Sequence, residues 1–387
     1  MIIRVDNTPR DYAWGSTTAI AELRGVQPSG KPEAELWLGT HPGSPTQISD
    51  PASAGGAKTI AELLDKQGYA PLPYLMKILA AAHPLSIQAH PSRAQAQEGF
   101  ARENSAGVPL DAPHRNYRDD EHKPELIYAL SETFEALCGF RPIPETIAQL
   151  EEFVAANIDV CAPTVALTEF ISELNQRGEA ALAWAMEWAL SGNNAQTLVA
   201  EVCVAGAKLK DSLISELAQD YPGDPGIVVA LLLNRVTLRK GQVLYLPAGN
   251  VHAYIKGLGV ELMAASDNVL RGGLTPKHVD VPELLSVIST EVLPVPYLEA
   301  EAIGQGVEIF SPDVPDFSLV HVHAQQEDAD STSIQLTRPA MATCTSGTLT
   351  ITGAHSSLEL SRGENAFISE EEAAISVRGS GELFIAV

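Results

Sequence analysis

Residues 241–252 read Gly241-Gln242-Val243-Leu244-Tyr245-Leu246-Pro247-Ala248-Gly249-Asn250-Val251-His252. Gly241 permits a tight turn, and the apolar run after it has the composition of a buried β-strand. Pro247 and Gly249 are turn residues that end this strand, so His252 begins the strand that returns. The pattern predicts two neighbouring strands with a histidine at the start of the second.

This spacing resembles the second sequence motif of cupin barrels, in which a hairpin directs a histidine into the barrel. Cupins usually carry an asparagine four residues after this histidine, and Lys256 stands there instead. A lone histidine in a strand is more often structural than a metal ligand, but its place in this motif favours the ligand. We therefore expect His252 to bind a metal ion inside a β-barrel.

A second segment, Ser86-Ile87-Gln88-Ala89-His90, supplies further polar side chains. Residues two apart share a face of a strand, so Ser86, Gln88 and His90 point the same way. Polar groups on the inward face of a barrel need partners, and a metal ion satisfies several of them. The alternative is a surface strand with one polar face.

A carboxylate comes from His122-Lys123-Pro124-Glu125, in which alternation places Lys123 and Glu125 on one face. Such a pair is most often a solvated ion pair, but the apolar run at 126–130 follows directly and predicts a strand that enters the core. The combined set suits a borderline divalent ion and leaves a position for water or substrate, as in a catalytic site. It consists of Gln88, His90, Glu125 and His252.

Between residues 143 and 225 apolar residues recur at helical rather than strand spacing. Trp184 and Trp188 lie four residues apart on one helix face, where we expect core packing rather than a ligand platform. The polar segment 97–120 is either a plain surface loop or a short helical excursion near a site.

We expect a mainly β protein that consists of a cupin (jelly-roll) catalytic barrel, an inserted α-helical domain and a second, metal-free jelly roll. The expected boundaries are 1–142 and 226–307 for the two parts of the catalytic domain, 143–225 for the helical domain and 308–387 for the C-terminal β domain.

Charge limits the partners of the chain. It carries 49 acidic against 25 basic residues, a net charge of −24, which repels nucleic acid and anionic membranes. No apolar run approaches the roughly 20 residues that span a bilayer, and the N-terminus lacks the pattern of a secretory signal. The four cysteines are scattered, and we expect a cytoplasmic protein in which they are small buried residues. An anionic substrate would need a locally basic pocket.

Seven stretches together resemble the signature segments of the type I mannose-6-phosphate isomerases, in the order of that family. They are Tyr12–Ser16, Ala34–Pro42, Pro73–Leu79, Pro84–Pro91, His122–Glu125, Ala136–Pro142 and His252–Lys277. The helical insertion and the C-terminal β unit agree with the family in position and length but carry few specific residues.

The resemblance implies a zinc enzyme of carbohydrate metabolism, on the route to GDP-mannose, that interconverts D-mannose 6-phosphate and D-fructose 6-phosphate. One Zn²⁺ per chain would be held at the positions of Gln88, His90, Glu125 and His252. The reaction moves a proton between C1 and C2 of the open-chain sugar through an enediol. We expect the chain to be a monomer.

The resemblance also implies roles around the metal ion. Arg271 is the candidate that stabilises the enediolate, because its guanidinium keeps its charge and offers forked donors. Ser86 and Lys277 are the candidates that bind the phosphate, with Arg271 nearby. The proton-transfer group is left open among Lys123, Glu261 and Asp267.

Two other classes of protein carry similar residues. An iron-dependent cupin dioxygenase also uses two histidines and a carboxylate, but an amide fourth ligand and a phosphate-binding Lys/Arg set favour an isomerase. In a non-catalytic sugar-binding cupin the ligand set is typically incomplete, whereas every member is present in this sequence.

Overall fold

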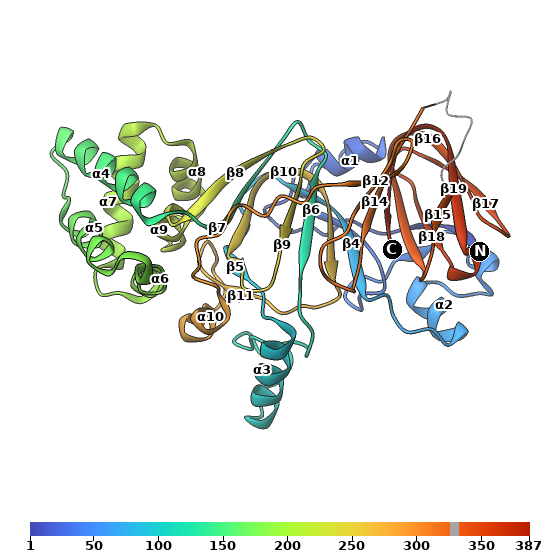
Figure 1. Ribbon diagram of the computed structural model, residues 1–387, viewed down its shortest axis with the longest axis horizontal. Coiled ribbons are helices and arrows are strands. Elements are labelled where there is room, and N and C mark those ends of the chain that lie inside the picture. The colour runs from blue at the N-terminus through green and yellow to red at the C-terminus, as the bar shows by residue number, and fades with distance from the viewer. Residues whose placement is uncertain (326–332) are drawn as a thin grey trace.

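A computed structural model describes residues 1–325 and 333–387 of the chain. A cluster of helices, a central antiparallel sheet and a second antiparallel sheet lie side by side along the longest axis (Figure 1). Helix and strand make up nearly equal fractions, 30% and 31%. The sequence predicted a mainly β protein, and the helical share is larger than that prediction implied.

The central sheet consists of β2 (Glu35–Leu38), β4 (Tyr74–Ala81), β5 (Gln88–Ala89), β6 (Glu125–Ala129), β7 (Thr133–Phe140), β8 (Leu233–Arg239), β9 (Val243–Leu246), β10 (His252–Ala264) and β11 (Leu270–Arg271). The long strand β10 pairs with β5 and β7 near its beginning and with β4 and β6 towards its end. In this register His252 lies opposite Gln88, and Met263 lies opposite Glu125. The sheet is curved, because the Glu125 side chain nevertheless reaches His252 at the other end of β10.

The helical cluster consists of α4 (Ile143–Asp159), α5 (Val165–Arg177), α6 (Ala181–Ser191), α7 (Ala195–Leu209), α8 (Ser212–Asp220) and α9 (Gly226–Leu231). The first five match the helical spacing seen between 143 and 225. Helix α9 differs from the prediction, which returned to strands at 226. Its run Gly226–Leu231 is buried on all sides, and a short apolar run without alternation does not distinguish a buried strand from a buried helix.

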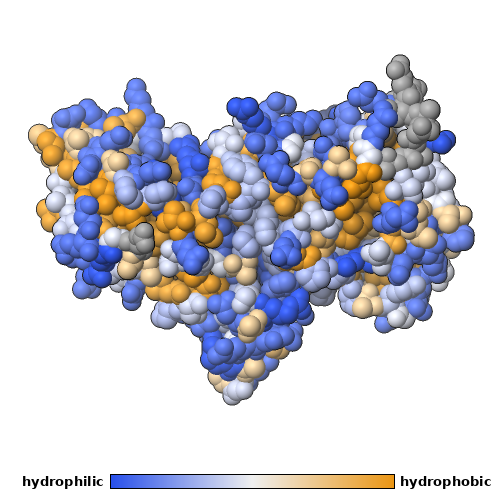
Figure 2. All heavy atoms as spheres, in the orientation of Figure 1, coloured by the Kyte–Doolittle hydropathy of each residue, from blue (hydrophilic) through white to orange (hydrophobic). Residues whose placement is uncertain are grey.

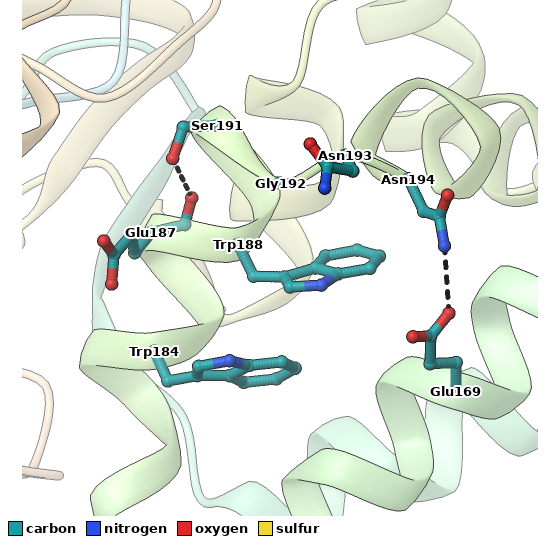
Figure 3. Close-up of a pocket in the computed structure, with 8 residues that line it drawn as sticks. All are labelled: Glu169, Trp184, Glu187, Trp188, Ser191, Gly192, Asn193 and Asn194. Atoms are coloured by element: carbon teal, nitrogen blue, oxygen red, sulfur yellow. Dashed lines mark hydrogen bonds between the residues drawn. The ribbon is translucent and has the colours of Figure 1, made fainter.

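The two tryptophans of α6 pack as the sequence analysis expected. Their rings lie 5.9 Å apart and each stacks near Phe170, so they extend the hydrophobic core of the cluster. The guanidinium of Arg177 lies 4.6 Å from the Trp184 ring, and Gly192 lies against the Trp188 ring. Both tryptophan rings also line a hollow, together with Glu169, Asn193 and Asn194 (Figure 3).

The second sheet consists of β12 (Glu301–Gly304), β13 (Val307–Phe310), β14 (Leu319–Ala324), β15 (Ser333–Gln335), β16 (Ala340–Thr352), β17 (Ser357–Ser361), β18 (Asn365–Ile368) and β19 (Ala374–Ala386), with β1 (Ile2–Asp6) and β3 (Gln47–Ile48). Strand β1 pairs with β18, so the first residues of the chain join the sheet of the last ones. The expected boundaries placed β1, β3 and β12 in the catalytic domain, because pairing between distant segments leaves no local signal.

Four helices lie outside the cluster: α1 (Ala19–Arg24), α2 (Ile60–Gln67), α3 (Arg93–Ser105) and α10 (Val281–Val287). Short 3₁₀ turns occupy Pro51–Ala54, Gly178–Ala180 and Glu370–Glu372. Helix α3 begins with a capping box between Ser92 and Gln95 and protrudes from the body as a hydrophilic arm (Figure 2). The segment 97–120 is therefore helical at first and a loop afterwards. No helix in the described ranges is long and apolar enough to cross a membrane.

Candidate active site

His90, Glu125 and His252 meet inside the central sheet, and all three are almost completely buried. Nε2 of His90 lies 3.3 Å from Oε1 of Glu125, and Nε2 of His252 lies 3.4 Å from Oε2 of the same carboxylate. One ligand atom from each residue lies within 4.8 Å of the others. The three side chains thus converge on one point from β6, from β10 and from the end of β5.

The hydrogen bonds of the two histidines determine which nitrogen carries the proton. Nδ1 of His90 lies 2.7 Å from the carbonyl of Asn268, and Nδ1 of His252 lies 3.0 Å from the carbonyl of Asn250. A carbonyl only accepts, so Nδ1 donates in both rings and each Nε2 presents a lone pair towards Glu125.

The cluster fits a bound cation. Within the described part of the chain, His90 Nε2 and Glu125 Oε2 are buried without a hydrogen-bond partner, which is costly unless another group satisfies them. Two imidazole nitrogens and a carboxylate are the donor set of a catalytic divalent site. Nε2 of the Gln88 amide lies 3.4 Å from Nε2 of His252, so the fourth predicted ligand lies beside the cluster.

Burial and neighbouring charges shift the pKa values here. Burial and the nearby charge of Lys123 lower the pKa of His90 to about 4, so the ring is neutral near pH 7. Burial alone would raise the pKa of Glu125, but the charge of Lys123 opposes burial, and that pKa lies well below its usual value. Nζ of Lys123 lies 3.0 Å from Oε1 of Glu125. The cluster therefore keeps an ionised carboxylate beside the neutral imidazole of His90, the states that bind metal.

A cavity of about 380 Å³ opens onto this cluster. Eight of the ten residues singled out from the sequence line it: Ser86, Gln88, Lys123, Glu125, Glu261, Asp267, Arg271 and Lys277. The other two, His90 and His252, are buried and touch it through Glu125. Tyr12, Trp14 and Trp37 supply aromatic walls.

Lys77 of β4 is a wall residue that the sequence analysis did not single out. Its Nζ lies 2.8 Å from Glu261 and 3.4 Å from Glu35. Burial alone would lower its pKa, but the two carboxylates raise it, so Lys77 is charged. Burial raises the pKa of Glu261 although Lys77 opposes it. The sequence does contain a signal for Lys77: it is a lysine in the middle of the apolar strand Tyr74–Ala81, and lysine is rarely buried without a partner.

The remaining charged residues of the pocket differ in their partners. Asp267 accepts a hydrogen bond of 3.0 Å from His41, which lowers its pKa and keeps it ionised at the rim. Burial lowers the pKa of Arg271 and of Lys277, and each also senses the positive charge of Arg118. Neither cation has a carboxylate partner among the described residues, so both are available to an anionic ligand.

Comparison with known proteins identifies the family. Residues 2–143 match the family described as phosphomannose isomerase type I, catalytic domain. Over 408 residues the chain is 37% identical to the mannose-6-phosphate isomerase of Escherichia coli (strain K12), with 97% of each protein covered. The chain belongs to the type I phosphomannose isomerases.

The likeness to this family extends over the whole chain. The human mannose-6-phosphate isomerase is 33% identical over 350 residues, which cover 80% of this chain and 79% of that protein. A crystal structure of a variant phosphomannose isomerase from Salmonella typhimurium superimposes with a TM-score of 0.87 at 32% identity, covering 100% and 98% of the two chains. A zinc-bound mannose 6-phosphate isomerase structure superimposes with a TM-score of 0.85 at 33% identity and the same coverage.

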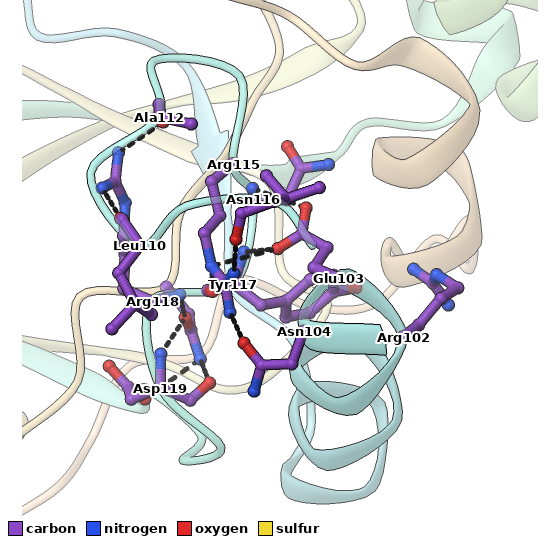
Figure 4. Close-up of polar contacts among 12 residues, drawn as sticks. Arg102, Glu103, Asn104, Leu110, Ala112, Arg115, Asn116, Tyr117, Arg118 and Asp119 are labelled. Atoms are coloured by element: carbon purple, nitrogen blue, oxygen red, sulfur yellow. Dashed lines mark hydrogen bonds and ion pairs between the residues drawn. The ribbon is translucent and has the colours of Figure 1, made fainter. Parts of the chain in front are cut away.

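In this phosphomannose isomerase hydrogen bonds hold the loop after α3 and join it to the active site. The buried guanidinium of Arg115 donates to Asn104 and to the carbonyl of Tyr117, and Glu103 accepts from the backbone of Asn116 and Tyr117 (Figure 4). Asn268 donates to Asp119 and accepts from the amide of Arg118. The carbonyl of Asn268 also accepts the hydrogen bond from Nδ1 of His90. This loop therefore helps to fix the orientation of the His90 ring.

Proposed function

We propose that this chain interconverts D-mannose 6-phosphate and D-fructose 6-phosphate with one bound zinc ion. The observation that carries the proposal is the His90, Glu125 and His252 cluster at a cavity whose unpaired cations are Arg271 and Lys277. The relatives named mannose-6-phosphate isomerase support the substrate, and the zinc-bound neighbour supports the metal.

His90, Glu125 and His252 would hold the ion, with the amide oxygen of Gln88 as a fourth ligand. When bound, zinc supplies Lewis-acid polarisation of the sugar oxygens. Lys123 keeps Glu125 ionised, and the carbonyls of Asn268 and Asn250 keep both histidines in the tautomer that presents Nε2.

Lys277 and Ser86 bind the phosphate in this proposal, and Arg271 stabilises the negative charge that develops on the enediolate oxygen. Support comes from the place of Ser86, Arg271 and Lys277 in the cavity lining. Among the described residues no carboxylate forms an ion pair with Arg271 or Lys277. A planar, permanently charged guanidinium suits a developing oxyanion, whereas a lysine suits a phosphate as a point charge.

We assign the proton transfer between C1 and C2 to the carboxylate of Glu261. Its pKa is raised by burial towards the range in which a base works near neutral pH, and it lines the cavity. Asp267 is a weaker base because His41 lowers its pKa, and Lys123 is engaged with Glu125.

We further propose that the central sheet is a cupin-type jelly roll, with the hairpin of residues 241–252 as its second motif. The catalytic domain would combine 1–142 and 226–307, apart from β1, β3 and β12, around the helical domain 143–225. The C-terminal β domain, 308–387, would be a second jelly roll, and the chain a monomer.

The test is a direct assay of fructose 6-phosphate formation from mannose 6-phosphate, with unphosphorylated mannose as a control. The proposal requires turnover of the phosphorylated sugar and a large loss of kcat/KM for mannose. An iron-dependent dioxygenase would instead show no isomerisation and would consume O₂ when loaded with iron. That result would replace the isomerase with the alternative class.

A further inference from the structure

The loop that carries Arg271 and Lys277 contains a residue in an unfavourable backbone conformation. Leu274 has φ of 53° and follows Gly273 with φ of 116°. A left-handed conformation is rarely adopted by a branched side chain and costs on the order of 1–3 kcal/mol, so it persists only where surrounding contacts enforce it. Leu274 is 1% exposed and packs in the core of the helical cluster while lining the cavity.

Asp224, in the turn that closes the helical insertion, supplies those contacts. Its Oδ1 accepts from the amide of Leu274 at 2.8 Å and from the amide of Gly226 at 2.7 Å. Its Oδ2 accepts from the amide of Thr275 at 3.2 Å. One carboxylate thus binds two successive amides of the loop at the strained residue, 50 positions away in the chain.

The two segments also approach closely at their backbones. A Cβ on Gly273 would lie 2.4 Å from Cα of Gly226, so neither position has space for a side chain. On its other side the loop is fixed to strand β5, because Gly272 donates to the carbonyl of Ile87 at 2.7 Å and Ile87 donates to Gly273 at 3.0 Å. Beyond Thr275, the loop runs directly to Lys277.

We propose that Asp224 is a positioning residue for substrate binding: it holds the loop at Leu274 and Thr275 so that Lys277 faces the cavity. The helical insertion therefore takes part in recognition of the sugar phosphate through this side chain. Arg271 lies in β11 and is held by its pairing with Gln88, so Asp224 acts on binding more than on the chemical step. The role of Lys277 in phosphate binding rests on the proposed function.

Charge and geometry predict opposite effects when Asp224 is changed. If the carboxylate acted only through its charge, its removal would relieve repulsion of the phosphate and lower KM. If it acts by holding the loop, its removal frees Leu274 to adopt a favourable φ, displaces Lys277 and raises KM. The direction of the change in KM therefore distinguishes an effect of charge from an effect of loop position.

The experiment compares Asp224→Ala and Asp224→Asn with Asp211→Ala. Asp211 is a matched control because its side chain also accepts a backbone amide within the helical cluster, at the start of α8, and among the described residues it has no hydrogen bond or ion pair with residues 271–277. For Asp224→Ala we expect KM for mannose 6-phosphate to rise on the order of tenfold with kcat within about twofold. The inhibition constant of inorganic phosphate should rise in parallel, with zinc content unchanged.

Asp224→Asn keeps one acceptor oxygen for the two shorter bonds, so its KM should lie between those of the wild type and the alanine variant. Asp211→Ala should lower thermal stability and leave KM unchanged. The proposal is overturned if Asp224→Asn leaves KM unchanged or lowers it, and this variant decides the matter should the alanine variant fail to fold. A wild-type chain without isomerase activity would instead overturn the proposed function.

Discussion

Replacing Lys77 with methionine tests the charge arrangement in the wall of the active site. Methionine matches the length of the apolar stem but removes the ammonium group that lies 2.8 Å from Glu261 and 3.4 Å from Glu35. Both carboxylates are buried, so the substitution leaves two acidic groups in an apolar wall without a counter-ion. We expect a loss of stability that depends strongly on pH.

The magnitude follows from the distances. At an effective dielectric constant of about 20, the attractions at these separations are about 6 and 5 kcal/mol before the desolvation of the lysine is subtracted. Breaking a buried pair by removing one partner typically costs about 3–5 kcal/mol. Protonation of a carboxylate limits this cost: with an ordinary pKa of about 4.3, it requires about 5 kcal/mol at pH 8 and about 1.6 kcal/mol at pH 5.5.

The sign of the pH effect follows from linkage. Removal of Lys77 moves the folded-state pKa of Glu261 further above its unfolded value, so the penalty is small below about pH 4 and grows as pH rises. Urea unfolding of wild type and Lys77→Met at pH 8 and pH 5.5 should give a difference of about 3–5 kcal/mol that shrinks by about 3 kcal/mol at the lower pH. Lys66→Met, at an exposed site on α2, is the control. A penalty below about 1 kcal/mol at pH 8, or one that grows on acidification, refutes the reasoning.

Three substitutions separate binding from chemistry in steady-state assays. Lys277→Ala should raise KM with little change in kcat, because a phosphate contact contributes equally to ground state and transition state; a fall in kcat alone would argue against that role. Arg271→Lys should lower kcat on the order of 10²–10³, because lysine keeps the charge but lacks the forked donors of the guanidinium. A near wild-type kcat with a raised KM would instead make Arg271 a phosphate contact. Glu261→Gln should lower kcat on the order of 10²–10⁴. It should also abolish the decline in kcat that the wild type shows at acidic pH. If the variant retains this decline, the base is another residue.

Local patterns indicated the candidate ligands Gln88, His90, Glu125 and His252, and the family resemblance added most of the other candidate residues that line the cavity. His252 and Gln88 were placed by turn chemistry and strand alternation, and the structure pairs these two residues in register. These signals are local in sequence, so no knowledge of the tertiary fold was needed to read them. The helical spacing of apolar residues that predicted α4 to α8 is likewise a local signal.

Long-range contacts were outside the reach of the sequence. The pairing of β1 with β18 joins residues more than 350 positions apart, and no local pattern indicates it. The hydrogen bond between Asp224 and Leu274 joins a turn and a loop that are 50 positions apart, and no local pattern indicates this contact. Lys77 was visible as a charge within an apolar strand, but its partners Glu35 and Glu261 become evident only when β2, β4 and β10 lie side by side.

The most direct test of zinc-dependent isomerisation is to measure bound zinc and the rate of fructose 6-phosphate formation in parallel, for wild type and for His252→Ala. Wild type should hold one zinc per chain, lose all activity on chelation and regain it with zinc more effectively than with magnesium. His252→Ala should keep its circular dichroism spectrum and cooperative unfolding while losing zinc and activity together, because the ion completes a catalytic site rather than the core. Full activity in a demonstrably zinc-free wild-type preparation would contradict the account.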